Sequence, residues 1–165
     1  MQIRLVAAAD WPALWAIVET VFRAGETYAI ATDIDEPSAY RYWVEQPAAT
    51  YVAVDDDGTI VGSYFIKANQ SGPGDHVANC GYMVAQAARG RGIAGALCEH
   101  SQHEAVALGF VAMQYNCVVA TNIGAVRLWQ RHGFGIVGTV PGAFRHPREG
   151  LVDAHVMYKR LAMPD

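Results

Sequence analysis

The chain has 165 residues, of which 52% are hydrophobic and 17% are charged. These values predict a single domain spanning residues 1–165 and exclude a disordered chain. The formal net charge is −4, from 12 Lys and Arg against 16 Asp and Glu, so the overall charge gives no support for nucleic acid as a partner. No apolar run approaches the roughly 18 residues of a membrane span, and no leader pattern is visible. We therefore expect a cytoplasmic protein without a membrane partner.

The first half of the chain is expected to contain a strand, two helices and a strand hairpin. Asp10 followed by Pro12 is typical of a helix start with Asp10 as the cap, and Gly25 is typical of a helix end. Asp55-Asp56-Asp57-Gly58 predicts a hairpin turn, and its aspartates lack the spacing of a calcium loop. The expected ranges are a strand at 2–7, a helix at 10–25, a loop at 25–36, a helix at 37–47, and strands at 50–54 and 59–68.

A strand, a glycine-rich turn and a helix follow between residues 79 and 110. The apolar run 80–84 predicts the strand, and residues 89–95 (RGRGIAG) form the turn. The first amides of a helix have no partner within it, and glycines let a phosphate approach the backbone. The sequence therefore favours an anion site here, although a turn with surface arginines is the simpler alternative. Small and apolar residues share one face of the expected helix: Ala94, Leu97, Cys98, Ser101, Ala105 and Leu108.

The remaining elements are expected to alternate to the end of the chain. Asn122 is a candidate cap for a helix that closes at Gly133. The expected ranges are strands at 110–119, 134–140 and 151–161, with a long loop at 141–150. The predicted order of elements is β-α-α-β-β-β-α-β-α-β-β.

Cysteine and histidine give no sign of a metal or a disulfide. Cys80, Cys98 and Cys117 form no CxxC pair, and we expect buried thiols. His100 and His103 lie one helical turn apart but have no third ligand, so we expect surface residues and no metal.

Two motifs resemble a known family. Arg89-x-x-Gly92-x-Ala94 is similar to the pyrophosphate-binding signature of the GNAT superfamily of acyl-CoA-dependent N-acetyltransferases. Residues 122–134 (NIGAVRLWQRHGF) resemble that family's Asn-x-x-Ala-x-x-Leu-Tyr-x-x-x-Gly-Phe segment. The resemblance implies an α/β fold with a mixed, mostly antiparallel, splayed sheet flanked by helices on both faces, and a possible homodimer.

The resemblance also implies acetyl-CoA as the acyl donor. A backbone N–H near Val84 would donate to the thioester carbonyl, and the amides of residues 89–95 would hold the diphosphate. The cofactor-binding residues that it implies are Met83, Val84, Arg89, Gly90, Arg91, Gly92, Ile93, Ala94, Gly95, Asn122, Ala125 and Trp129.

The chain departs from the family where the general base and acid usually lie. Asn79 stands at the position of a common carboxylate, and Trp129 stands at the position of a common tyrosine. An amide cannot accept a proton at neutral pH. One interpretation makes Asn79, Asn116 and Asn122 an amide-lined catalytic site. The other makes these asparagines caps of turns and strand ends, with His76 or Tyr115 as the catalytic group.

Residues 140–158 and the loop 25–28 (GETY) resemble a GNAT subgroup related to the fungal azetidine-2-carboxylate N-acetyltransferases. This resemblance implies an amino acid or imino acid as the acceptor, and we take Glu26, Tyr28 and Arg145 as the substrate-binding residues. Arg41 and Arg148 are further candidates for a carboxylate partner. Any one aromatic residue of segment 26–43 is alternatively explained by packing on the sheet.

The predicted function is transfer of acetyl from acetyl-CoA to the amine of a small metabolite. The alternatives are acetylation of a protein N-terminus or lysine, a non-catalytic acyl-CoA-binding regulatory domain, and a nucleotide-binding module.

Overall fold

The computed structural model describes residues 1–161 and contains one seven-stranded sheet with the strand order β1-β2-β3-β4-β5-β7-β6. Neighbouring strands are antiparallel except for β4 and β5, which are parallel. The strands are β1 (Gln2–Leu5), β2 (Ala49–Val54), β3 (Ile60–Ala68), β4 (Val77–Val84), β5 (Ala112–Val119), β6 (Gly135–His146) and β7 (Gly150–Arg160). The helices are α1 (Trp11–Ala24), α2 (Glu36–Tyr40), α3 (Ile93–Ala107) and α4 (Ile123–Arg131). This order of elements confirms the sequence prediction.

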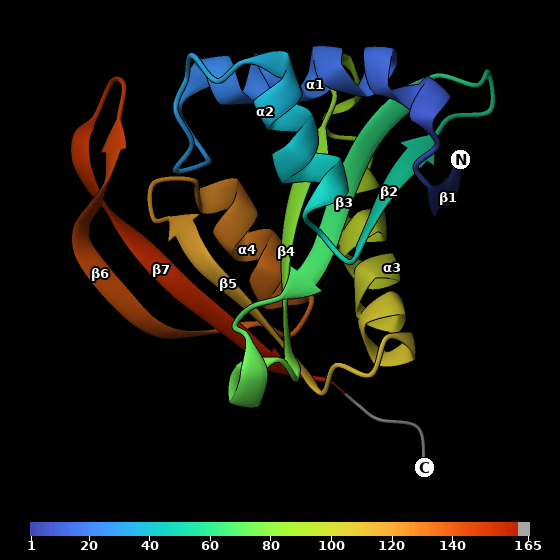
Figure 1. The fold of residues 1–165 in the computed structure, drawn as a ribbon. Helices are drawn as coiled ribbons and strands as arrows, with labels where there is room; N and C mark the ends of the chain where they lie inside the picture. Colours follow the sequence, from blue (N-terminus) through green and yellow to red (C-terminus); the bar gives the residue numbers. More distant parts are fainter. Residues whose placement is uncertain (162–165) are drawn as a thin grey trace.

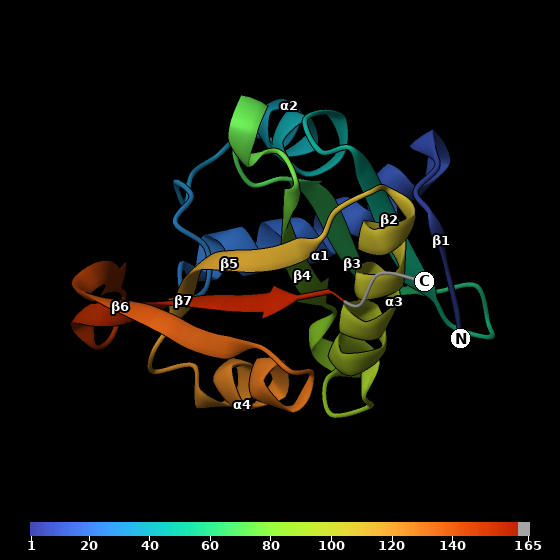
Figure 2. The ribbon, with the colours of Figure 1, turned by 90° about the horizontal axis from the view of Figure 1, so that it is seen from below.

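Helices cover both faces of the sheet, with α1 and α2 on one face and α3 and α4 on the other (Figure 2). Each face has its own core, because successive side chains of a strand point to opposite faces. On β3, Phe65 packs with Phe22 and Trp43 on the α1 face, whereas Tyr64 packs with Leu97 on the α3 face. The expected α/β fold with helices on both faces is confirmed.

The strands β4 and β5 are paired over a short stretch only. Val77 pairs with Ala112 and Ala78 pairs with Met113, and no further pair follows. The two strands then separate toward the top of Figure 1, where β5 leaves together with β7 and β6. The β5–β7 register also shifts between Tyr115 and Val118, and such a bulge bends a strand. The sheet is therefore splayed along one line, between β4 and β5.

The prediction of a long loop at 141–150 was wrong. β6 continues to His146, and only residues 147–149 separate it from β7. The β6–β7 register shifts between Val140 and Phe144, so a bulge accommodates Pro141 and Gly142 within the strand. Proline is tolerated at a bulge and on an edge strand, where no ladder hydrogen bond requires its missing N–H.

Two local predictions need correction. Asp10 precedes α1 but makes no side-chain cap bond; its carboxylate binds the Arg4 guanidinium at 2.7 and 2.9 Å. This contact with Arg4 lowers the pKa of Asp10. The second helix is α-helical only to Tyr40, and residues 41–45 continue it as a wider π-helical turn.

The Ser63 side chain links Trp43, in the core on the α1 face, to Tyr51 of β2. Loss of this hydroxyl should destabilise the fold. The buried hydroxyl donates to Tyr51 O at 2.7 Å and accepts from Trp43 Nε1 at 3.0 Å. Ser63→Ala leaves the buried indole N–H without a partner, so we expect the free energy of unfolding to fall by about 1–3 kcal/mol. Urea denaturation measures this, with the exposed Ser71→Ala as the matched control. Equal midpoints for the two variants would contradict the role given to Ser63.

Candidate functional site

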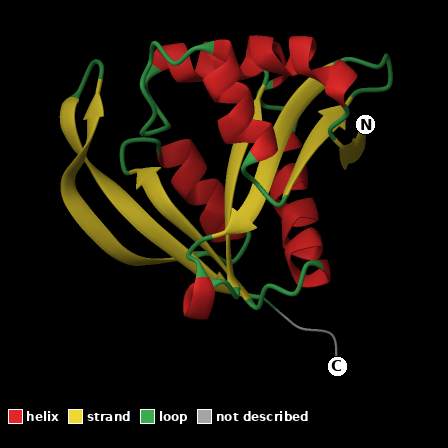
Figure 3. Ribbon diagram, viewed as in Figure 1, coloured by secondary structure: helices red, strands yellow, loops and turns green. Residues whose placement is uncertain are grey.

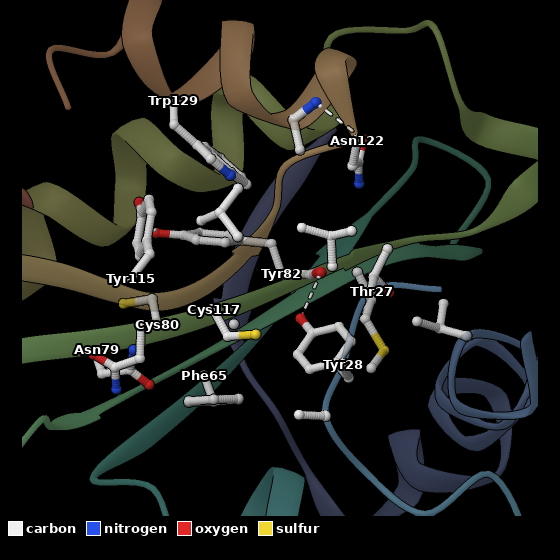
Figure 4. A pocket seen from close by; sticks show the side chains of 18 of the residues that line it. Thr27, Tyr28, Phe65, Asn79, Cys80, Tyr82, Tyr115, Cys117, Asn122 and Trp129 are labelled. Carbon is white, nitrogen blue, oxygen red and sulfur yellow. Dashed lines mark hydrogen bonds between the residues drawn. The ribbon is translucent and has the colours of Figure 1, made fainter. Parts of the chain in front are cut away.

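A cavity of about 420 Å³ occupies the splay between β4 and β5. Its walls come from both strands, from the loop between α1 and α2, and from α4 (Figure 4). The predicted site residues that line it are Tyr28, Asn79, Met83, Val84, Arg89, Asn116, Asn122, Ala125 and Trp129. The predicted residues outside this lining are Glu26, Gly90, Arg91, Gly92, Ile93, Ala94, Gly95 and Arg145.

The backbone of β4 presents hydrogen-bonding groups to the cavity. Ala85 N–H donates to Val61 O of β3 at 2.9 Å. Backbone groups alternate in direction along an antiparallel pair, so those of Val84 and Tyr82 point away from β3, toward the splay. Tyr82 O accepts from the Tyr28 hydroxyl at 2.8 Å, as Figure 4 shows. The Val84 N–H therefore faces the cavity where no neighbouring strand lies beside it.

The N-terminus of α3 fits a phosphate group. Gly90 and Gly92 have φ values of 77° and 79°, a left-handed conformation that favours glycine. A Cβ at either position would meet no atom within 4 Å, so the space before the helix is open. Gly92 is the N-cap and supplies no side-chain bond, whereas the Asn122 side chain caps α4 by accepting from Ala125 N at 3.2 Å. The first amides of α3 are therefore available to an anion such as the diphosphate of acetyl-CoA.

The two arginines of the turn differ in their contacts. Arg89 lines the cavity. Arg91 instead binds Asp55 on the β2–β3 turn at 2.7 Å, and this contact lowers the pKa of Asp55. Gly95 has a packing role, because a Cβ there would lie 3.2 Å from His132 Nε2. The positive charge available to a ligand at this end comes from Arg89 and the helix amides.

The three asparagines do not form one group. Asn79 Nδ2 donates to Gln114 O at 2.9 Å and so links β4 to β5 just beyond their last pair. Asn116 accepts from Gln114 Nε2 at 2.9 Å and donates to Asn69 Oδ1 at 2.6 Å. Figure 4 shows Asn122 at the opposite end of the labelled side chains from Asn79. Asn79 thus binds the backbone of Gln114, Asn116 binds the Gln114 side chain, and Asn122 caps α4.

The residues that line the cavity include no Asp, Glu or His. The Tyr115 hydroxyl lies 2.9 Å from the Tyr82 hydroxyl, which lies 2.7 Å from Ser101 Oγ in the core. Burial raises the pKa of Tyr82 and of Tyr115 well above the usual tyrosine value. Burial also raises the pKa of the Cys117 thiol. None of these groups is a base at neutral pH, and the exposed His76 lies outside the lining.

The loop between α1 and α2 lies on the side of the β6–β7 hairpin (Figure 3). Glu26 forms an ion pair with Arg148 of the hairpin turn, and Tyr28 packs edge-on against Phe22 and Trp43 at 5.6 and 5.8 Å. Together with the Tyr28–Tyr82 bond, these contacts fasten the loop at the cavity. Glu26 therefore helps to hold the loop in place through Arg148 and does not itself line the cavity.

Sequence reasoning missed Lys67, which lines the cavity from β3. A signal was present, because Lys67 directly follows the largely apolar run 60–66 (IVGSYFI). A lysine inside an apolar strand needs a reason for its position, but the sequence alone does not show that a cavity lies beside it.

The described residues contain no group of three or more His, Cys, Asp or Glu placed to hold a metal. His100 is not simply a surface residue, because its Nδ1 lies 2.8 Å from the buried Tyr64 hydroxyl. Cys80 and Cys98 are buried free thiols, and Cys117 is a half-buried one. Within residues 1–161, no helix is both long and apolar enough to cross a bilayer.

Comparison with known proteins gives consistent matches. The sequence pattern of the acetyltransferase (GNAT) family matches residues 11–134. N-acetyltransferase aca1 of Schizosaccharomyces pombe is 33% identical over 111 residues, which are 67% of this chain and 53% of that protein. The chain thus spans about half the length of this curated relative.

Solved structures agree with the sequence match. A GCN5-related N-acetyltransferase from Kribbella flavida is 46% identical, with a TM-score of 0.93 over 97% of each chain. A phosphinothricin acetyltransferase from Sinorhizobium meliloti, solved in complex with acetyl-CoA, is 20% identical. Its TM-score is 0.85 over 98% of this chain and 88% of that chain, a likeness of fold. The family pattern, the splayed sheet and the open N-terminus of α3 together show that this chain belongs to the acetyltransferase (GNAT) family of N-acetyltransferases.

Proposed function

We propose that the protein transfers acetyl from acetyl-CoA to the amine of a small amino acid or imino acid. The observation that carries this proposal is the cavity in the splay, which has the open amides of α3 toward one end and an amide-rich group toward the other. This arrangement suits a long donor whose diphosphate binds at α3. The acceptor would then bind next to the thioester, between β4 and β5.

Acetyl-CoA supplies an activated thioester carbonyl when it is bound. In the proposal, the amides of residues 93–95 and the Arg89 guanidinium hold its diphosphate. The Val84 N–H donates a hydrogen bond to the thioester oxygen and stabilises the charge that develops there during attack. Ala125 and Trp129 form the apolar wall on α4, where Trp129 packs against Tyr82 at 4.9 Å.

The chain's own groups orient the acceptor but do not deprotonate it. Asn79 and Asn116 offer amide oxygens and N–H groups, and no carboxylate or imidazole lines the cavity. We infer that the acceptor is bound as the neutral amine and that its attack on the thioester carbon forms the C–N bond, breaks the C–S bond and releases CoA as the thiolate. The proton of the amine leaves to water. Because no anion lines the cavity, no charged group there favours the ammonium form of the acceptor.

A small acceptor fits this site better than a peptide. The loop 25–35 is bonded to β4 through Tyr28 and to the β6–β7 hairpin through Glu26. These two contacts hold the loop beside the cavity, between β4 and the hairpin. A wall held in this way supports a small metabolite over a protein N-terminus or lysine.

We expect thiol release from acetyl-CoA with amino acids or imino acids as acceptors. The measurement is a free-thiol assay against amino acids, imino acids, short peptides, polyamines and aminoglycosides, with the thermal shift by CoA in parallel. A CoA shift without thiol release from any amine would contradict the proposed enzyme. Release from peptides alone would contradict the small acceptor.

Gly92→Glu should lower the affinity for CoA by at least about 100-fold, because it places a carboxylate where the diphosphate would bind. Titration calorimetry with CoA measures the change. Gly109→Glu is the matched control, since Gly109 also has a positive φ (89°) with open space around it, at the other end of α3. If the Gly92 variant folds and keeps its CoA affinity, the diphosphate is held elsewhere.

Asn79→Ala should lower kcat about tenfold, the equivalent of one hydrogen bond, and leave the Kd of CoA nearly unchanged. The expected cause is loss of the amide that orients the acceptor. Because Asn79 also bonds Gln114 O, urea denaturation is measured alongside the kinetics. A loss of stability with an unchanged kcat would make Asn79 a structural link between β4 and β5.

A further inference from the structure

We propose that Lys67 selects acceptors that carry a carboxylate, by binding that carboxylate with its ammonium group inside the cavity. This inference rests on the proposed function and names the residue that would decide the substrate class.

The position of Lys67 places its charge at the acceptor side of the splay. Lys67 is opposite Asn79 in the β3–β4 register, and its side chain lines the cavity. Its Nζ lies 5.4 Å from the ring centroids of both Tyr42 and Phe65. The side chain therefore extends along β3 toward Phe65, on the α1 face of the sheet.

The β4 backbone opposite Phe65 is covered by aromatic side chains. Phe65 pairs with Gly81 of β4, and a Cβ on Gly81 would lie 2.6 Å from Phe65 Cε1 and 3.0 Å from the Tyr28 hydroxyl. Glycine at this position lets the ring and the hydroxyl lie directly against β4. Lys67, Tyr28 and Asn79 all line the cavity, and Lys67 and Asn79 lie opposite each other in the β3–β4 pair.

No protein anion neutralises Lys67. Within residues 1–161, none of the ion pairs or side-chain hydrogen bonds involves its Nζ. Its partners are the faces of two aromatic rings, which attract a cation but leave its hydrogen-bonding N–H groups free. A half-buried ammonium of this kind is a ready site for a carboxylate from outside the protein.

The other cationic side chains near the cavity either bind protein groups or lie away from the acceptor end. Arg89, the second cation in the lining, lies in the turn before α3, at the diphosphate end. Arg148 is paired with Glu26, and the exposed Arg41 donates to Ser38 Oγ. Arg145 is exposed on β6 and outside the lining. Lys67 is thus the cation at the acceptor end of the cavity, among the described residues.

The same charge disfavours cationic acceptors. With no Asp or Glu in the lining, a polyamine or an aminoglycoside would bring additional positive charge next to Lys67 without an anion to balance it. An amino acid or imino acid brings one carboxylate, which Lys67 neutralises, and one amine, which the site does not hold as an ammonium ion.

The test compares Lys67→Met with the unchanged protein on matched acceptors, proline against pyrrolidine and alanine against ethylamine. Free-thiol release gives kcat and KM for each. We expect Lys67→Met to raise KM for the carboxylate-bearing member by about 10- to 100-fold, the range for a hydrogen bond to a charged group. The values for pyrrolidine and ethylamine should change less than about threefold. Lys67→Arg should restore part of the KM for proline and alanine.

Two controls separate this selection from general damage. The exposed Arg160→Gln removes one positive charge outside the lining and should leave both kinetic constants unchanged. The thermal shift of Lys67→Met by CoA should match that of the unchanged protein. Equal changes in KM for proline and pyrrolidine, or no change for either, would overturn the role of Lys67 and leave the proposed function standing. Absence of thiol release from every amine by the unchanged protein would overturn both.

Discussion

The short pairing of β4 with β5 is the constraint on which the rest of this structure depends. Only Val77 and Ala78 of β4 are paired with β5, and the remainder of that edge is left without a neighbouring strand. Backbone N–H and C=O groups at such an edge require partners. The protein satisfies one of them with the Tyr28 hydroxyl and leaves the Val84 N–H to the cavity. The candidate site is thus an opening within the sheet.

In the proposed function, the backbone, more than the side chains, supplies the binding chemistry. The amides at the start of α3 are left open by a glycine cap, and the amide of Val84 is left open by the splay. Fixed dipoles of this kind need no proton transfer and little reorganisation. In the proposed function, these amides hold the donor, whereas Asn79 and Trp129 stand where the resemblance places a base and an acid.

Contacts between distant segments decide the character of the proposed acceptor end. The loop 25–35 reaches β4 through Tyr28 and the β6–β7 hairpin through Glu26, so three segments far apart in sequence enclose one space. Lys67 provides the charge of this space, and the amides of Asn79 and Asn116 provide its polarity. The Lys67 charge suits an acceptor that is bound by its carboxylate. Because the lining has no base, the site suits an acceptor that attacks as a neutral amine.

The sequence by itself determined the order of the elements, the glycine turn before α3 and the Asn122 cap of α4. Each of these depends on residues a few positions apart, which local preferences describe well. Only the tertiary structure decided that β6 passes through Pro141, that Arg91 is held by Asp55, that Asn79 and Asn122 are apart, and that Lys67 lines the cavity. These features depend on strand register and on the point where β4 and β5 separate. Both are set by packing between segments distant in the chain, which a local sequence pattern does not encode.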